Sequence, residues 1–351
     1  MPTAALALRI AAVYLASIAA GYLFHRLGLP LPWMIGPIFS TALLLFNERL
    51  NVTIPVSTRP VCQAIVAAQV GLAFSPAVLA SLVDLAPLLI GMALLMVVTG
   101  FAIAVLLSRM GDMPFSAALI ATLPTSPVEA AVIAERYGIP RAPVILTQTM
   151  RIGIVVVAVP LAIVIADGQT GRSGGGFTGL PDPVGLAVLA LVTAAGMVAG
   201  RKLRIANPFF LGPLALSSAV TAAGIDLPDF PSPVLWGAQV VLGTWLGSNF
   251  RRSLFARARR MVAASVVSTI LFIAVSGLVS ATLSRVLDLS WETLVLASTP
   301  GGVTEMALTA KFLGIDVALI TAFHLVRIFI VVPSIPLIMD RLHRRGCRGL
   351  R

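Results

Sequence analysis

Two stretches of the sequence decide the fold: LPTSPVEAAVIAERYGI at residues 123–139 and TPGGVTEMALTAKFLGI at residues 299–315. They are copies of one motif, since a shift of 176 positions carries Glu129 onto Glu305. The same shift aligns further pairs along the chain, among them Pro32 with Pro208, Gly36 with Gly212, Gln63 with Gln239, Gly138 with Gly314, and Arg151 with Arg327. One ungapped offset over so much of the chain indicates an internal duplication. The chain therefore has two halves of one design.

The composition places both halves in a membrane. Of the 351 residues, 58% are hydrophobic and only 11% are charged, and the mean hydropathy is +1.00. So few charged side chains cannot cover the surface of a water-soluble protein of this size. The net charge of +11 comes from short basic clusters beside apolar spans, at 201–204, 251–260 and 341–351. Such clusters are typical of positive-inside topology signals rather than of a nucleic-acid-binding face.

Apolar spans recur in the same order in both halves. They lie at 5–24, 33–47, 60–82, 85–107 and 141–165, and again at 184–200, 208–223, 234–250, 261–283 and 316–338. Most are long enough to cross about 30 Å of hydrocarbon as helices. The first span has the charge and the small residues of a signal peptide. Its counterpart in the second half cannot be cleaved away, so we expect the first span to belong to the fold.

Each motif copy follows the fourth span of its half and reads as two short helices around a break. We expect helices at 113–123 and 127–137 in the first copy, and at 291–298 and 303–313 in the second. Each arm covers about half a membrane, so a pair either crosses as a broken helix or enters and returns as a re-entrant hairpin. The re-entrant alternative places the basic clusters on one side of the membrane, which the positive-inside rule favours.

A re-entrant pair leaves five crossings in each half, so the two halves insert with opposite orientations, as in secondary transporters. We therefore predict an all-α integral membrane protein of two inverted repeats, each with about five transmembrane helices and a re-entrant or broken-helix motif. The predicted parts are an N-terminal membrane repeat (1–166), a glycine-rich linker (167–183), a C-terminal membrane repeat (184–340) and a basic cytoplasmic tail (341–351).

The glutamate of each motif has two interpretations. Ser126 precedes a proline, and Glu129 follows at the third helical position, which is the pattern of a capping box. A capping role alone explains both glutamates. Alternatively, two helix N-termini that meet inside the membrane present backbone donors to an anionic or polar substrate. The substrate-binding residues of this second interpretation are Thr125, Ser126, Glu129, Gly301, Gly302, Thr304 and Glu305.

The last span of each half adds an arginine, Arg151 or Arg327. Each arginine either forms a buried ion pair with the glutamate of its motif or binds an anionic substrate through its fork of donors. Three residues before them, Gln148 of the first half is replaced by His324 in the second. This histidine is either a packing residue or, because histidine titrates near neutral pH, a proton carrier beside Arg327. Arg151, His324 and Arg327 complete the predicted substrate site.

The sequence offers no pattern for catalysis or metal binding. P-loop, HExxH and GxSxG motifs are absent, and Cys62 and Cys347 imply neither a disulfide framework nor a zinc site. We therefore expect no enzyme activity, no catalytic residues, no cofactor and no metal. The glycine-rich stretch at 168–183 lacks the strand and the Lys-Ser/Thr pair of a phosphate-binding loop, so we expect a flexible linker there.

The duplicated motifs resemble those of the membrane AbrB-duplication family. The resemblance covers essentially the full chain and rests on the two motif copies, on PWMIGP at 32–37 and PFFLGP at 208–213, and on the RIGIVVVAVPL and RIFIVVPSIPL runs that begin at Arg151 and Arg327. Members of that family are described as ammonia monooxygenase regulators or AbrB-family transcriptional regulators. The arrangement is also similar to the glutamate:sodium and hydroxycarboxylate symporter folds, which implies transport without naming a substrate.

These observations predict a multi-pass protein of the bacterial inner membrane with both termini in the cytoplasm. The leading hypothesis is a secondary transporter of a small anionic or polar metabolite, with alternating access at the paired loops. The alternative is a membrane-bound regulator or sensor that binds a ligand at the same site without net transport. The expected partners are the lipid bilayer and a small-molecule or ion substrate, with no nucleic acid, and a homodimer is left open.

Overall fold

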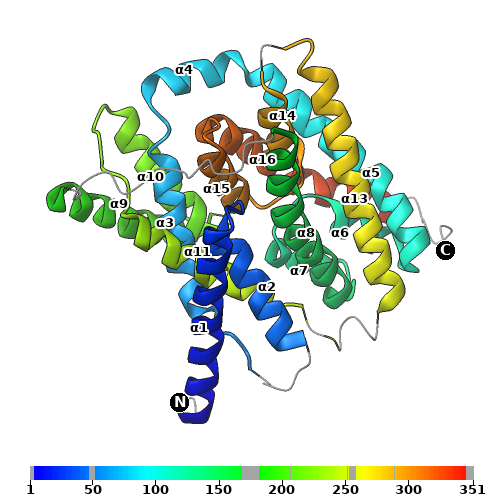
Figure 1. Ribbon diagram of the computed structural model, residues 1–351. Coiled ribbons are helices and arrows are strands. Elements are labelled where there is room, and N and C mark those ends of the chain that lie inside the picture. Colours follow the sequence, from blue (N-terminus) through cyan, green and yellow to red (C-terminus); the bar gives the residue numbers. More distant parts are fainter. Residues whose placement is uncertain are drawn as a thin grey trace. The chain divides into compact units, whose positions relative to one another are not determined.

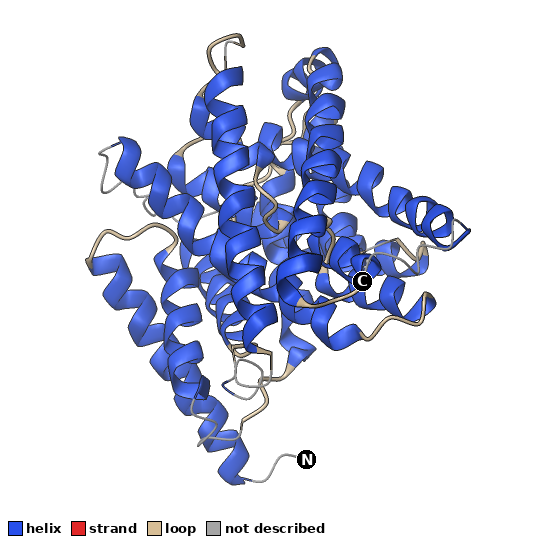
Figure 2. Cartoon of the chain, turned by 90° about the vertical axis from the view of Figure 1, so that its right-hand side faces the viewer, coloured by secondary structure: helices blue, strands red, loops and turns tan. Residues whose placement is uncertain are grey.

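The computed structural model describes residues 4–46, 52–167, 182–205, 207–250, 252, 258–287 and 289–344. Within these ranges all regular structure is helical, without a strand (Figure 2). The all-α prediction is confirmed. Most of the predicted linker and most of the basic tail lie outside the described residues.

Helices follow one another in a similar order in the two halves (Figure 1). In the first half they are α1 (Ala4–Arg26), α2 (Pro32–Phe46), α3 (Arg59–Gly71), α4 (Pro76–Asp84), α5 (Ala86–Gly111), α6 (Phe115–Thr122), α7 (Pro127–Arg136) and α8 (Arg141–Asp167). In the second half they are α9 (Pro183–Lys202), α10 (Pro208–Ala222), α11 (Ser232–Gly247), α13 (Arg259–Leu283), α14 (Trp291–Ser298), α15 (Val303–Leu313) and α16 (Val317–Arg344).

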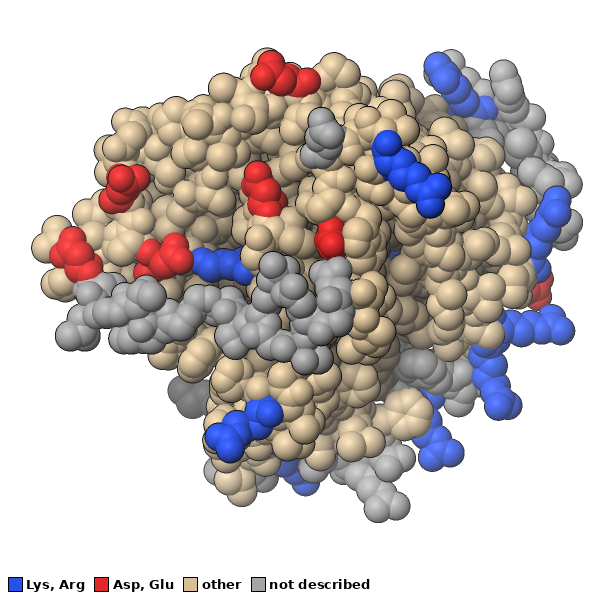
Figure 3. Space-filling view, turned by 45° about the horizontal axis from the view of Figure 1, so that its top comes forward, with Lys and Arg blue, Asp and Glu red and all other residues tan. Residues whose placement is uncertain are grey.

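Six of the described helices are long and apolar enough to cross a membrane: α1, α5, α8, α9, α13 and α16. The chain is therefore a multi-pass membrane protein. Charged side chains are sparse on the face shown in Figure 3, as expected for a protein surrounded largely by lipid. By contrast, α2 and α10 have only 15 residues each.

The third span of the first half differs from its prediction. The apolar span predicted at 60–82 is made of two helices, because α3 ends at Gly71 and α4 is turned by 84° from it. Pro76 explains where the second helix begins. Proline lacks an N–H group and disfavours helical geometry in the residue before it, but it fits the first turn of a new helix. Counted as one bent span, this pair raises the number of candidate crossings to seven.

The helices form two compact units, and each unit takes segments from both halves of the sequence. Unit 1 comprises Met1–Asp84, Pro160–Arg252 and Thr304–Leu319, and unit 2 comprises Leu85–Val159, Ser253–Val303 and Ile320–Arg351. Unit 2 therefore contains both breaks of the repeated motif, whereas most of α15, the helix that follows the second break, belongs to unit 1.

Unit 1 packs its helices closely through glycines. A Cβ atom built on Gly36 of α2 would lie 2.7 Å from the carbonyl oxygen of Ala20 in α1, and one on Gly212 of α10 would overlap the carbonyl oxygen of Gly196 in α9. Only glycine allows this approach of two backbones. The glycines of the Gly-Pro pairs in α2 and α10 thus serve helix packing.

Unit 2 holds the first arm of each motif copy against a long helix in the same way. In the first half, the Thr122 hydroxyl at the end of α6 donates to the carbonyl of Gly100 in α5, at 3.2 Å. In the second half, the Ser276 hydroxyl of α13 donates to the carbonyl of Ser298 at the end of α14, at 3.0 Å. These four residues are equivalent under the 176-residue shift. The repeat is thus visible in side-chain contacts between equivalent residues.

Candidate substrate site at two helix breaks

The two breaks have the same backbone geometry. Leu123 and Thr299 follow α6 and α14 with extended dihedral angles, because each precedes a proline, and proline disfavours helical geometry in the residue before it. The next amide after each proline turns back: Thr125 N–H donates to the Leu123 carbonyl and Gly301 N–H donates to the Thr299 carbonyl, both at 2.8 Å. The expected arms around both breaks are confirmed, within two residues at each end.

The second arm of the first motif begins with a capping box. The Ser126 hydroxyl accepts from Glu129 N–H at 3.2 Å, and the Glu129 carboxylate accepts from Ser126 N–H at 3.3 Å through Oε2. The capping interpretation of Glu129 is therefore confirmed. Its other oxygen, Oε1, is buried and has no hydrogen-bond partner among the described residues. In the second motif Gly302 precedes α15 and provides no side chain for such a box.

Arg151 does not pair with Glu129, which corrects the ion-pair alternative for the first motif. Its guanidinium is buried, with 4% of the residue exposed, and donates to the carbonyls of Thr122 at 2.6 Å and Ala121 at 3.4 Å. These carbonyls lie at the C-terminal end of α6, where helix geometry leaves acceptors unpaired and the dipole favours a cation. Glu129 instead caps the N-terminal end of α7.

Gln148 is the residue of this break that the sequence analysis did not assign to the site. Its amide nitrogen donates to the carbonyls of Ile120 at 2.9 Å and Leu123 at 3.0 Å, and to the Thr125 hydroxyl at 3.2 Å. Its amide oxygen accepts a hydrogen bond from Arg151. One fully buried side chain therefore serves both sides of the break. The signal in the sequence was its alignment with His324.

The second break has the arginine but not the amide. Arg327, with 3% of the residue exposed, donates to the carbonyls of Gly301 at 3.0 Å and Thr299 at 3.4 Å. His324 is fully buried beside the backbone of Leu296. Neither of its ring nitrogens has a hydrogen-bond partner among the residues described, and the same holds for Nε of Arg327. This break therefore retains unpaired nitrogens.

The buried charge around the breaks is positive. Arg151 and Arg327 lie close enough for their charges to interact, and within the described ranges neither forms an ion pair with a carboxylate. Nε of Arg151 also lacks a partner among these residues. A buried cation without a counter-ion is costly, and inside a membrane protein such a residue usually serves binding or transport. Unit 2 contains eight of the ten predicted site residues: Thr125, Ser126, Glu129, Arg151, Gly301, Gly302, His324 and Arg327.

Two of the predicted residues, Thr304 and Glu305, belong to unit 1 instead. The carboxylate of Glu305 is half-buried and lies within electrostatic reach of Arg59. The guanidinium of Arg59 is 3.8 Å from the centroid of the Trp245 ring, a cation–π contact between α3 and α11. Arg59 and Trp245 were not among the predicted site residues, because they lie far apart along the chain and no local sequence pattern connects them.

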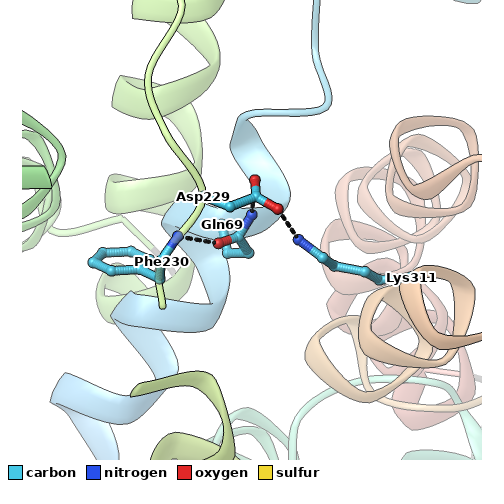
Figure 4. A network of polar contacts seen from close by, with 4 residues as sticks. All are labelled: Gln69, Asp229, Phe230 and Lys311. Carbon is cyan, nitrogen blue, oxygen red and sulfur yellow. Dashed lines mark hydrogen bonds and ion pairs between the residues drawn. The ribbon is translucent and has the colours of Figure 1, made fainter. Parts of the chain in front are cut away.

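A polar network holds the far end of α15 within unit 1 (Figure 4). The amide nitrogen of Gln69 in α3 donates to Asp229 Oδ1 at 2.6 Å, and its amide oxygen accepts from Phe230 N–H at 2.8 Å. Lys311 Nζ of α15 forms an ion pair with Asp229 Oδ2 at 2.8 Å. The network connects α3, the segment before α11 and the second arm of the motif.

Comparison with known proteins agrees with this duplicated helical architecture. The family model described as "Transition state regulatory protein AbrB" matches residues 2–124 and 33–343, which together span both halves. The chain belongs to the AbrB family. The resemblance of the motifs to this family is thereby confirmed.

Two relatives are similar to this AbrB-family chain over almost their whole lengths. A Bacillus subtilis (strain 168) protein named "Uncharacterized protein YhjN" is 25% identical over 354 residues, covering 93% of this chain and 91% of the relative. An Escherichia coli (strain K12) protein named "Putative regulator AbrB" is 23% identical over 319 residues, covering 90% of this chain and 91% of the relative. The sequence similarity thus extends over nearly the full length of all three chains.

Proposed function

We propose that this AbrB-family protein is a secondary transporter of a small anionic or polar metabolite. The observation that carries the proposal is the pair of helix breaks in unit 2, each with a buried arginine that forms no ion pair with a carboxylate of the described residues. Non-helical backbone inside a membrane protein is tolerated where it lines a binding site or a wet cavity, and interrupted helices form the substrate sites of many secondary transporters. One unit contains both breaks, as expected if that unit carries the ligand during alternating access.

The proposal includes the inverted-repeat topology. Each half then contributes five crossings and one re-entrant pair, with α6/α7 and α14/α15 as the pairs. Their short first arms, of eight residues each, support this, because an arm of that length covers only part of the hydrocarbon. An odd number of crossings in each half gives the halves opposite orientations, which is the architecture that alternating access uses.

Flux into proteoliposomes tests the proposal. The purified protein is reconstituted, preloaded with a mixture of small carboxylates and amino acids, and assayed for counterflow of each labelled compound. Gly302→Ala adds a methyl group at the tip of the second break, and we expect it to lower flux strongly while the protein still folds and inserts. Gly237→Ala in α11 is the control, because a Cβ atom there meets nothing within 4 Å. Wild-type flux in Gly302→Ala contradicts the assignment of the site to this loop.

A second candidate function is a membrane-bound regulator or sensor that binds the same ligand without net transport. The name of the E. coli relative, "Putative regulator AbrB", favours it. The two candidates differ in one measurement. A sensor binds the ligand in detergent and shows no counterflow in proteoliposomes, whereas a transporter shows both.

A further inference from the structure

The two breaks are equivalent in sequence position but not in how their buried polar atoms are satisfied. At the first break the amide of Gln148 donates to Ile120, Leu123 and Thr125. The equivalent positions of the second half are occupied by Leu296, Thr299 and Gly301. His324, the equivalent of Gln148, lies beside the backbone of Leu296 but makes no hydrogen bond of regular geometry to any of the three. The second break therefore lacks the hydrogen bonds that Gln148 makes at the first break.

The polar groups without a partner among the described residues differ between the two breaks. At the second break they are the ring nitrogens of His324 and Nε of Arg327, on one face of α16. An imidazole always has at least one N–H donor, and the guanidinium offers donors only. At the first break they are Nε of Arg151, a donor, and Oε1 of Glu129, an acceptor with negative charge. Donors alone face a ligand at the second break, whereas an anion at the first break would also meet the carboxylate of Glu129, so the second break favours an anion more strongly.

The burial of His324 makes this difference informative. The residue is fully buried, and buried polar groups in folded proteins nearly always have a partner. Its neighbour Arg327 uses two of its nitrogens on the carbonyls of Gly301 and Thr299, which keeps the guanidinium at the break with Nε unused. The nearby charge of Arg151 adds to the positive potential there.

We propose that the second break alone binds the ligand, that the ligand is a small oxyanion, and that it accepts hydrogen bonds from the imidazole of His324 and the guanidinium of Arg327. At the first break, the hydrogen bonds of Gln148 hold the backbone instead, so the role of that break is structural. This inference rests on the proposed function, since it assigns the ligand of that function to one break and to one chemical class. Carboxylates and inorganic phosphate share the chemistry that these donors recognise.

The test exchanges the two equivalent residues. His324→Gln gives the second break the amide of the first, and we expect a higher unfolding temperature without ligand together with an affinity at least about tenfold lower, as the loss of a hydrogen bond to a charged group implies. Gln148→His removes three donated hydrogen bonds, and we expect a lower unfolding temperature. His25→Gln is the matched control, because it makes the same substitution at an exposed histidine of unit 1. The probes are lactate, succinate and inorganic phosphate, measured by the ligand-induced shift of the unfolding temperature.

A second readout depends only on the wild-type protein. The chain has three histidines, so a spectrum of protein labelled with ¹⁵N-histidine is simple, and the signals lost in His324→Gln identify His324. We expect at least one probe to move the ring nitrogen signals of His324 and to leave those of His25 unchanged. The probes that move the His324 signals show whether the site binds carboxylates, phosphate or both.

Two results overturn the inference: an affinity in His324→Gln within twofold of wild type, or no probe that moves the His324 signals. Counterflow separates this inference from the proposed function. If a probe moves the His324 signals and no compound shows flux, the transporter proposal fails and the oxyanion site stands. If flux occurs and His324→Gln does not change it, the transporter stands and the assignment of the site fails.

Discussion

Arg151 shows that a buried charge in this protein is satisfied by backbone rather than by a carboxylate. Its donors reach the carbonyls of Ala121 and Thr122, which the interruption of α6 leaves without helical partners. Gln148 donates to the carbonyls on either side of these two, those of Ile120 and Leu123. The two side chains therefore replace the hydrogen bonds that a continuous helix would have made.

This arrangement predicts a small effect for Glu129→Gln. If Glu129 only caps α7, the amide oxygen of glutamine keeps the acceptor, and we expect a loss of under about 1 kcal/mol in the free energy of unfolding. Removing one partner of a buried ion pair would cost about 3–5 kcal/mol. Ser126→Ala should cost about 0.5–2 kcal/mol, because it removes the acceptor for Glu129 N–H. Reversible unfolding in mixed detergent measures all of these.

The control for that comparison is Glu135→Gln. Glu135 is 62% exposed and forms an ion pair with Arg141 at 3.3 Å, and surface pairs contribute about 0–1 kcal/mol. A loss in Glu129→Gln several times that of Glu135→Gln would restore the ion-pair interpretation.

At the scale of helices, glycines determine how closely the elements of unit 1 approach. Gly243 and Gly247 of α11, four residues apart, lie against the carbonyls of Met34 and Ile38 in α2. The spacing is the small-xxx-small pattern of tightly packed membrane helices. Because the contact atoms are backbone, an added side chain cannot be accommodated by a change of rotamer.

Gly212→Ala should therefore destabilise the protein by about 1–3 kcal/mol or more, because its Cβ atom would overlap the carbonyl oxygen of Gly196. Gly237→Ala in α11 is the matched control. A Cβ atom there meets nothing within 4 Å, so the higher helix propensity of alanine should stabilise by about 0.5–1 kcal/mol. Opposite signs for the two variants are the expected result. Equal effects would show that the contact between α9 and α10 is looser than described.

The network around Gln69 makes a second prediction at this scale. Gln69→Leu leaves the amide of Phe230 without its acceptor, so we expect a loss of about 1–3 kcal/mol. Lys311→Met should change stability by under about 1 kcal/mol, because the ion pair is partly exposed, at 36% for Lys311 and 65% for Asp229. Thermal unfolding of both variants, at low and at high salt, checks the order, and only the effect of Lys311→Met should depend on salt.

For the whole molecule, the open question is which ends of the helices face the cytoplasm. The positive-inside rule predicts that Arg141, the 251–260 segment and the C-terminus are cytoplasmic, and that Asp182 and Asp316 are on the opposite side. Single cysteines introduced at these positions into a variant without Cys62 and Cys347 can be labelled from either side of intact cells. Labelling of the 251–260 segment and the C-terminus from opposite sides contradicts the re-entrant model and favours motif copies that cross the membrane.

The sequence alone determined the features that depend on local chemistry. Apolar composition identifies a membrane protein, the 176-residue shift identifies the duplication, and a proline after Leu123 and after Thr299 ends a helix wherever it occurs. The capping box at Ser126 and Glu129 is equally local, because the two residues are three positions apart. For this reason the arms of both motif copies agree with their predicted positions.

Only the tertiary structure decided which distant groups meet. Besides Gln148, the partners of Arg151 are carbonyls about thirty positions away, and its sequence neighbours carry no information about those carbonyls. The same holds for Arg59 over Trp245 and for Lys311 with Asp229. A buried charge takes whichever acceptor the packing leaves unpaired, so its partner follows from the arrangement of helices. That arrangement, with each compact unit drawn from both halves, is a property of the folded chain.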